Sequence, residues 1–523
     1  MREMIKHLLV VAILLSSALS TWAYSFVDNG ICYVVSYGKT VAVTYKDSDY
    51  NSYSGAVVIP SEVTNDGITY TVGGIGYNAF NGCVGLTSVT IPNSVTWIDK
   101  CAFCDCSALT SIAIPETVTD IGDTAFSGCT ELKSINLPNA LKEIKFYTFD
   151  RCKSLTSITI PNSVRRIGSS AFRSCSGLTS IAIPESVTEM GDGVFGECSE
   201  LSSVNLPNSL TAIEGSTFYR CKRLTSIKIP SSINRIEEWA FIGCTNLVKV
   251  EISDLDAWCN ISFGGEYSNP LYFAHKLYLN GDLVTNIVVP ASVTKIGDYA
   301  FQGCSSLTSV TLHDQITSIG VSAFQECSGL TSITIPDEVT SIGVSAFQKC
   351  SGLTSITVPD KVTSIGVSAF ENCSKVTALT IGSSVNTIGA YAFDIARLGR
   401  IKVLNPEPPT CDDETVFRSV SRAKCVLTVP KGTKDLYKST YVWWNFSSIE
   451  EDEAEGGVEA VETDVLTVSA EDGEIRIAGA AGAVAEVYSL SGVMLYRSTE
   501  AAIAMPRGMY IVKVAATTTK VVL

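Results

Sequence analysis

Residues 323–345 read AFQECSGLTSITIPDEVTSIGVS, residues 346–368 read AFQKCSGLTSITVPDKVTSIGVS, and the next unit opens with AFENCSKVTALTIGSSVNTIG. The period is 23 residues, and a phenylalanine marks its register at Phe80, Phe103, Phe126, Phe149, Phe172, Phe195, Phe218 and Phe241, then at Phe301, Phe324, Phe347, Phe370 and Phe393. We assign Tyr278 to the phenylalanine position of one degenerate unit between the two runs, which gives 14 units and leaves 14 extra residues. Such regularity predicts a solenoid.

Each unit contains a segment that suits a half-buried strand. Ile333 and Ile335 flank Thr334, which is the period of two that buries one face of a strand. Pro336 ends the strand because proline has no N–H to give to a sheet. Residues 323–327 are too few for an independent helix, so we expect one helical or 3₁₀ turn there. A single unit cannot bury its own apolar edge, and stacked units form a continuous core.

The pattern AFxxCxxLTSITIPxxVTSIG resembles the 23-residue leucine-rich repeat of the BspA-like bacterial surface proteins over about residues 55–450. The resemblance implies an α/β fold, a right-handed leucine-rich-repeat solenoid with a parallel sheet on its concave side and short helical turns. It also implies an adhesin that binds host extracellular matrix proteins or other bacterial or host surface macromolecules. A glycan-binding module for polysaccharide capture is the alternative, because a repeat scaffold does not fix its ligand.

The remaining segments have different compositions. A basic start and a short apolar run are typical of a secretory signal, which predicts an exported protein. Together with the family resemblance, this implies a protein that is secreted or displayed on the outer-membrane surface of a bacterium. No later stretch holds 18 apolar residues, so we expect no membrane-spanning helix. In chain order we predict a signal peptide (1–23), an N-terminal cap with a hairpin (24–79), the repeat array (80–405), a C-terminal cap (406–449), an acidic linker (450–464) and a small all-β sandwich (465–523).

The last domain carries a second resemblance. Its segments VYSLSGVMLY and RGMYIVKVAATTTKVVL resemble the C-terminal sorting domain of proteins exported by the type IX secretion system. This resemblance implies translocation across the outer membrane. The alternative is an ordinary accessory β-domain.

The 18 cysteines mostly follow the repeat. Twelve share one position: Cys83, Cys106, Cys129, Cys152, Cys175, Cys198, Cys221, Cys244, Cys304, Cys327, Cys350 and Cys373. Stacked strands lie about 4.7–4.9 Å apart, whereas a disulfide needs Cβ atoms about 3.5–4.5 Å apart and facing each other. We therefore expect a buried column of thiols. Cys411 with Cys425 is the best candidate for a disulfide. Cys101, Cys104 and Cys106 lack a fourth ligand, and we predict no metal and no cofactor.

Charge and motif content limit the function. With 53 acidic and 38 basic residues the net charge is −15, which argues against nucleic acid as a partner. His275 and His313 lie in different units, and we see no nucleophile beside a base, no phosphate-binding loop and no zinc-protease motif. We predict a monomer that is not an enzyme.

The outward strand positions are mostly serine and threonine, and charge enters only at Lys228, Lys249 and Glu251. Beside them lies an aromatic insertion, residues 253–281, with Trp258, Phe263 and Tyr267. These six residues are our candidate binding site, because aromatic and charged side chains supply most hot spots. The alternative is that the aromatics form a small core for the inserted loop. A basic cluster, Lys142, Lys145, Arg151, Lys153, Arg165, Arg166 and Arg173, is either a patch for an acidic polymer or a solvated face.

Overall fold

The computed structural model describes residues 24–47 and 50–452, and seven strands within residues 467–522. The chain divides into two units after Asp452, and each is described by itself. The expected signal peptide and residues 453–464 of the expected acidic linker lie outside the described residues.

The N-terminal segment of the first unit is a set of hairpins. Strand β1 (Phe26–Asp28) pairs antiparallel with β2 (Ile31–Tyr37), which turns at Gly38 into β3 (Thr40–Thr44). Strand β5 (Glu62–Asn65) pairs antiparallel with β6 (Ile68–Ile75), and β6 lies between β3 and the first coil of the array. The end of the stack is thereby covered by paired backbone, as an open-ended solenoid requires.

Most coils of the array carry two parallel strands, one more than the sequence predicted, and the coil of Phe149 has a strand of the second row alone. The first row is β4 (Gly55–Val58), β7 (Leu86–Thr90), β9 (Ser111–Ile112), β11 (Ser134–Ile135), β14 (Ser180–Ala182), β16 (Ser203–Asn205), β18 (Ser226–Lys228), β20 (Lys249–Ile252), β22 (Leu277–Leu279), β24 (Asn286–Val288), β25 (Ser309–Thr311), β27 (Ser332–Ile333), β29 (Ser355–Thr357), β31 (Ala378–Ile381), β33 (Arg400–Val403), β35 (Val426–Val429) and β36 (Ser448–Glu451). This is the row that the Ile-Thr-Ile alternation predicts, and strands of regular coils pair at the same repeat position, for example Ser309 with Ser332, whereas β4 and β7 pair with a register shift at Gly55.

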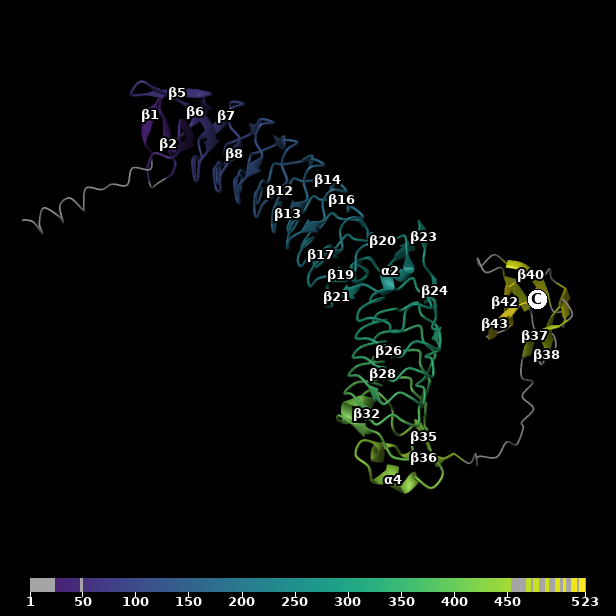
Figure 1. The fold of residues 1–523 in the computed structure, drawn as a ribbon. Coiled ribbons are helices and arrows are strands. Elements are labelled where there is room, and N and C mark those ends of the chain that lie inside the picture. The colour runs from purple at the N-terminus through teal and green to yellow at the C-terminus, as the bar shows by residue number, and fades with distance from the viewer. Residues whose placement is uncertain are drawn as a thin grey trace, which may run out of the picture. The chain divides into compact units, whose positions relative to one another are not determined.

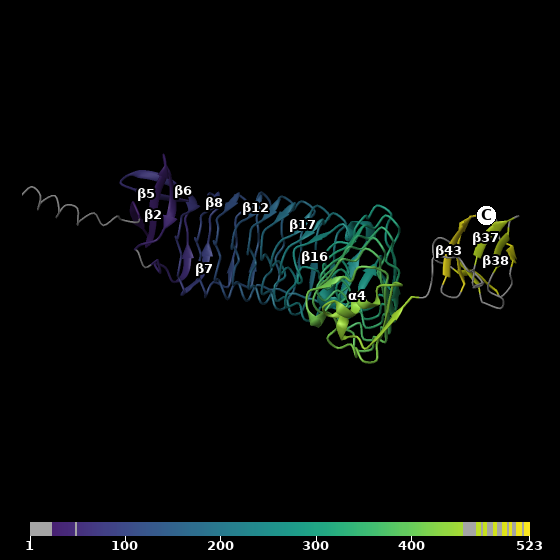
Figure 2. The ribbon, with the colours of Figure 1, turned by 90° about the horizontal axis from the view of Figure 1, so that it is seen from below.

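The second row comes from the VTSIG part of each unit. It comprises β8 (Trp97–Ile98), β10 (Asp120–Ile121), β12 (Glu143–Ile144), β13 (Arg166–Ile167), β15 (Glu189–Met190), β17 (Ala212–Ile213), β19 (Arg235–Ile236), β21 (Ser262–Phe263), β26 (Ser318–Ile319), β28 (Ser341–Ile342), β30 (Ser364–Ile365), β32 (Thr387–Ile388) and β34 (Thr410–Cys411). Figure 2 shows the two rows along opposite edges of the stack, with β7 and β16 on one edge and β8, β12 and β17 on the other. A strand of two residues has no alternation to recognise, so periodicity could not find this row.

The segment that begins with the phenylalanine is a run of linked turns, not the helical turn that we expected. Ser322 and Glu326 have φ angles of 51° and 61°, in the left-handed region, and a helix cannot contain them. The backbone N–H of Phe324 donates to Ala346 O of the next coil at 2.8 Å, so this side of the coil also has hydrogen bonds between units. Within the described residues the α-helices are α2 (Leu255–Cys259), α3 (Leu271–Ala274) and α4 (Lys434–Ser439).

Phenylalanine rings fill the centre of the stack. Phe80 through Phe241 are fully buried and stack in sequence, with centroid distances such as 5.0 Å for Phe80–Phe103 and 5.3 Å for Phe218–Phe241. A second ladder runs from Phe301 to Phe393 and continues to Phe417, 5.9 Å from Phe393. Phe417 follows after 24 residues instead of 23, so the coil geometry extends beyond the position where we placed the end of the period.

The predicted buried column of cysteines is confirmed, and it has a further role. The Cys350 thiol donates to the carbonyl oxygen of Phe324 at 3.0 Å, and the same bond, 26 residues back along the chain, recurs from Cys106 to Cys373 wherever two regular coils are adjacent. Each of these carbonyl oxygens also accepts a backbone N–H within its own coil, for example Phe324 O from Cys327 N at 3.1 Å, so the thiol is a second donor that links one coil to the next. Cys411 and Cys425, our candidate disulfide, are free buried thiols in the structure.

The C-terminal end of the array is closed by aromatic side chains. The 3₁₀ helix η1 (Glu414–Phe417) carries the last ring of the ladder, and η2 (Trp443–Asn445) places Trp443 against it at 5.5 Å. Trp443 is fully buried and its indole N–H donates to Pro409 O at 2.8 Å.

The second unit consists of two antiparallel sheets. One is β37 (Thr467–Glu471), β38 (Glu474–Ala478) and β41 (Ala502–Ala504), and the other is β40 (Met494–Ser498), β39 (Ala485–Tyr488), β42 (Met509–Val514) and β43 (Thr517–Val522). Val487 and Val512 are paired neighbours and both are buried. This arrangement is the small β-sandwich that the sequence predicted.

Candidate functional site

Three of the six predicted site residues lie together on the first strand row. Lys228 at the end of β18 is paired with Glu251 in β20, so their side chains are neighbours on the outer face. Lys249 forms an ion pair with Glu251 at 2.7 Å, and both side chains are about one-third exposed. The structure thus forms a compact charged cluster on a part of the face that otherwise carries mostly small, uncharged side chains.

Tyr278 is the member of this cluster that sequence reasoning missed. We had placed it at the phenylalanine position, in the core, but it lies in β22 with Glu251 as its register partner. Its ring lies below the Lys249 ammonium, 4.8 Å from the ring centroid, which is a cation–π contact. We define the Lys249 cluster as Lys228, Lys249, Glu251 and Tyr278.

The other three predicted residues lie elsewhere. Trp258 and Phe263 are only 1% and 7% exposed, and their rings contact each other edge to face at 5.5 Å. The indole N–H of Trp258 donates to Ala300 O at 3.0 Å. Tyr267 is half-buried on the turn side of its coil and contacts Tyr272 at 5.1 Å. The aromatic insertion therefore forms mainly a core of its own, the alternative that the sequence left open.

The insertion makes a break in the array, which we call the seam (residues 252–298). The parallel pairing of β19 with β21 places Phe263 opposite Ile236, so the two residues share one repeat position. Phe263 comes four residues later than the 23-residue period requires, and α2 accommodates these four extra residues. Ser268, fully buried, thereby takes the phenylalanine position in place of Tyr278, and Leu271 takes the cysteine position. The other ten extra residues form the hairpin of β22 with β23 (Asp282–Leu283) before β24 resumes the period.

Both strand rows are interrupted at the seam. The first row ends with β22 and β23 and starts again at β24, and the second row ends at β21 and resumes with an isolated bridge between Ile296 and Ile319. In Figure 1 the direction in which the coils stack changes where α2 lies. The seam thus divides the stack of coils into two parts. We call the coils before the seam the first array and the coils after it the second array.

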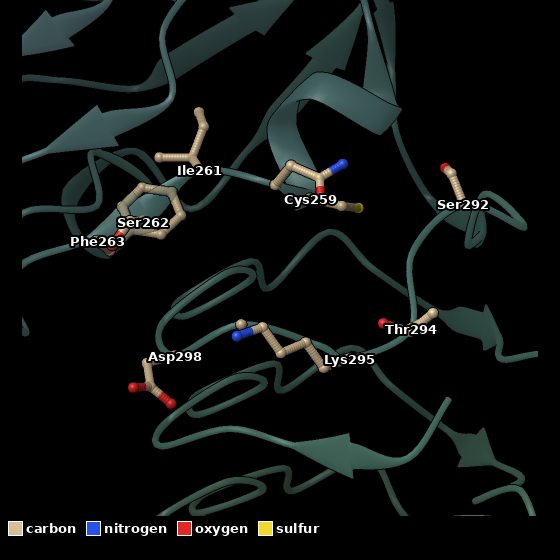
Figure 3. A pocket seen from close by; sticks show the side chains of 10 residues that line it. Cys259, Ile261, Ser262, Phe263, Ser292, Thr294, Lys295 and Asp298 are labelled. Carbon is tan, nitrogen blue, oxygen red and sulfur yellow. The ribbon is translucent and has the colours of Figure 1, made fainter. Parts of the chain in front are cut away.

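A hollow of about 250 Å³ lies in the interrupted second row. Figure 3 shows Cys259 and Phe263 on one side of it and Lys295 and Asp298 on the other. A Cβ added at Gly297 would meet nothing closer than Ile261 O at 3.9 Å, whereas at Gly343, the same repeat position, it would lie 2.6 Å from the backbone of Gly320. The coils are therefore farther apart at the seam. Burial raises the pKa of the Cys259 thiol to about 12, so this cysteine is protonated at neutral pH.

The predicted basic cluster is largely paired with acids. Lys145 contacts Asp120 at 2.7 Å, and Arg166 lies between Glu143 and Glu189 at 3.4 and 3.6 Å. Arg151 contacts Asp150 and Arg173 contacts Glu197. This arrangement favours the solvated face over a patch for an acidic polymer.

The groups with catalytic potential have structural partners. His275 Nδ1 is 3.0 Å from Gly303 O, and His313 Nε2 is 3.0 Å from Pro290 O. Among the described residues no three His, Cys, Asp or Glu side chains are grouped as a metal site, and no helix is long and apolar enough to cross a bilayer.

Comparisons with known proteins agree with this geometry. The family described as "BspA type Leucine rich repeat region" matches residues 61–179, 142–267 and 273–398. A leucine-rich repeat protein of Bacteroides ovatus ATCC 8483 has a similar solved structure, with a TM-score of 0.54 and 28% identity over 78% of this chain and 100% of that chain. A leucine-rich cell surface protein of Faecalibacterium prausnitzii A2-165 is also 28% identical, over 72% of this chain and 94% of that one, with a TM-score of 0.41. No curated protein sequence matches. The family matches cover more than half of the chain, and the protein belongs to the BspA-type leucine-rich repeat family.

Proposed function

We propose that this protein is a secreted or surface-displayed adhesin that binds host extracellular matrix proteins or the surface macromolecules of other cells. The family and the extended coil surface support a binding function, and a relative with this repeat is described as a cell surface protein. The C-terminal unit has two antiparallel sheets, and its segments VYSLSGVMLY and RGMYIVKVAATTTKVVL resemble a sorting domain of the type IX system.

The Lys249 cluster is the observation that carries the proposal. In the first array it is the place where the strand face departs from small, uncharged side chains, and it combines an ion pair, a cation–π contact and an exposed apolar neighbour, Val248, at 59% exposure. Tyrosine beside charged side chains is the composition of protein-binding hot spots. Affinity would come from this cluster together with shallow contacts to the neighbouring coils.

The test is binding of the full chain to immobilised panels of extracellular matrix proteins and of glycans. The double variant Lys249→Ala/Tyr278→Ala removes the cluster while leaving the buried Trp258 in place. The matched control is Ser332→Ala/Thr334→Ala, which truncates exposed side chains on the same row of the second array.

We expect the first variant to lose at least tenfold in affinity for a protein ligand, about 1.4 kcal/mol, and the control to lose little. Circular dichroism checks that both variants fold. Equal losses would point to contacts distributed over the strand face, and binding to glycans alone would support the polysaccharide-capture alternative.

A further inference from the structure

The turn side of the first array carries a groove that is separate from the Lys249 cluster. Two adjoining hollows form it, of about 440 and 580 Å³, which share Asp192, Ser216 and Trp239. We call the two together the Trp239 groove. It lies on the side of the coils where the turns stack, whereas the Lys249 cluster lies on the first strand row.

The repeat explains the shape of the groove. One position in successive coils is occupied by Tyr147, Ser170, Gly193, Ser216 and Trp239. All five have φ angles between 53° and 62°, and hydrogen bonds such as Gly193 N–H to Gly215 O at 2.8 Å fix the backbone beneath them. Three small residues thus form a rigid floor between two aromatic walls. The walls are four coils apart, roughly 20 Å, which is the length of an extended peptide of about six or seven residues.

The walls present exposed aromatic surface. The Trp239 side chain is 54% exposed and Tyr147 is 39% exposed, although both are large enough to be buried in most proteins. Tyr219, which also lines the groove, is already covered by the guanidinium group of Arg220, 5.0 Å from its ring centroid. The contact between Arg220 and Tyr219 is therefore an example, within the groove, of the cation–π contact that the exposed Trp239 indole could make with a ligand.

The charge of the lining is acidic. Five carboxylates line the two hollows, Asp192, Glu197, Glu214, Glu237 and Glu238, against one base, Arg173. Arg173 pairs with Glu197, and Arg235 pairs with Glu214 and Glu237. Asp192 and Glu238 are exposed and have no ion pair within 4.0 Å in the described part of the chain, and they lie in the same hollow as the indole.

We propose that the Trp239 groove binds an extended peptide segment that carries arginine or lysine. A cationic side chain would stack on the Trp239 indole and pair with Asp192 or Glu238, and the small floor would admit the peptide backbone. Charge complementarity selects this occupant over a neutral glycan, because a sugar would use the indole but gain little from the net negative charge. The proposal is independent of the adhesin function assigned to the strand face, and either can fail alone.

The experiment measures the fluorescence anisotropy of a labelled peptide of about seven alternating arginine and serine residues titrated with the full chain. The comparison peptide has citrulline in place of arginine, which keeps the shape and removes the charge. Trp239→Asn removes the indole with a residue that tolerates a positive φ and that the first coil uses at this position, as Asn78. The matched control is Tyr391→Asn, the same repeat position in the second array, with a φ angle of 59°.

We expect binding of the arginine peptide that weakens as salt rises, about tenfold weaker binding by Trp239→Asn and by Asp192→Asn/Glu238→Gln, and no change by Tyr391→Asn. Equal affinity for the citrulline peptide, equal effects of the two aromatic substitutions, or no binding at millimolar peptide would overturn the proposal. Trp239-dependent binding of a neutral oligosaccharide with no binding of the arginine peptide would overturn it in favour of a glycan.

Discussion

The regular coil at Phe347 and the seam coil at Ser268 bury the same repeat position in different ways. In the regular coil a ring stacks between two identical rings, and a cysteine thiol donates to the phenylalanine carbonyl oxygen of the coil before. In the seam coil a serine, with Leu271 in the cysteine position, replaces this pair, and Trp258 from the inserted α2 is buried against Phe263 with its indole N–H on Ala300 O. Regular coils obtain their core from their neighbours, whereas the seam coil obtains part of its core from inserted residues.

The largest expected effect of this difference is an alkaline loss of stability in the regular coils. Burial raises the pKa of column thiols such as Cys198, Cys244 and Cys373 from 9 to about 12. Both states are protonated well below the unfolded pKa of 9, so this contribution to stability is complete there. Above pH 9 the unfolded thiols ionise and the buried ones do not, so each removes roughly 1.4 kcal/mol per pH unit until about pH 12.

Burial raises the pKa of all twelve column thiols, so their effects should act in the same direction and stability should fall steadily above pH 9. Melting followed by circular dichroism from pH 8 to 11 measures the decline. Cys350→Ala should be less stable at pH 8 and should show a shallower decline above pH 9, because it lacks one of the ionising groups. A melting temperature that is flat between pH 8 and 11 would contradict the prediction.

Phe347→Ala should cost about 3–5 kcal/mol, because it opens a cavity between two stacked rings. Coupling in a solenoid is between nearest neighbours, so faster hydrogen exchange should centre on the coils of Phe324, Phe347 and Phe370.

Ser268→Ala is the control at the same repeat position in the seam. It removes one hydroxyl that bonds to Gly265, which costs about 1 kcal/mol. Similar losses from the two variants would mean that the phenylalanine ladder is not the main support of the regular coils.

Two glycines at one repeat position test the spacing of the coils. Gly343→Ala should destabilise by about 1–3 kcal/mol, because its Cβ would lie 2.6 Å from the backbone of Gly320. Gly297→Ala has 3.9 Å of room and should stabilise by about 0.4–1 kcal/mol through the unfolded state. Denaturant titration measures the free energy of unfolding of the two variants. The two changes in this free energy should have opposite signs if the seam is open, and equal signs would show that its coils are in ordinary contact.

The smallest effect is expected from Trp258→Phe, which keeps most of the apolar volume and removes the indole N–H. Ala300 O would retain the Asn269 amide as a donor at 3.2 Å, so the loss should be about 0.5–1.5 kcal/mol. Exchange at residues 255–263 and 298–302 reports it locally. A decrease of more than about 3 kcal/mol in the free energy of unfolding would show that Trp258 stabilises more than one coil.

The repeat predicted the solenoid, its first strand row and the cysteine column, because each depends on a residue type that returns every 23 positions. It did not predict the second row, whose strands have two residues, or the left-handed turns at Ser322 and Glu326. Those turns are set by hydrogen bonds between coils and not by local propensity. The C-terminal extension to Phe417 was missed because one inserted residue shifts the register.

The candidate site was predicted only where the register was regular. Lys228, Lys249 and Glu251 came from counting strand positions, and they lie together. Tyr278 and Trp258 were misjudged because the 14 extra residues divide into four and ten, a division that depends on where α2 and the β22–β23 hairpin form. The alternation of Leu277 and Leu279 around Tyr278 was the available signal for a strand.

The bond from a cysteine thiol to the carbonyl 26 residues earlier recurs wherever two regular coils are adjacent, and it makes regular coils interchangeable at both ends. Excising residues 324–346 would bring Phe301 against Phe347, and the Cys350 thiol would meet the carbonyl of Phe301 as Cys327 does now. Each coil added or removed changes the reach of the molecule by about 4.8 Å without changing its ends. Duplication or loss of a 23-residue unit in the gene can therefore change the length of either array. The seam consists of segments that occur once, so it cannot be lengthened or shortened in this way.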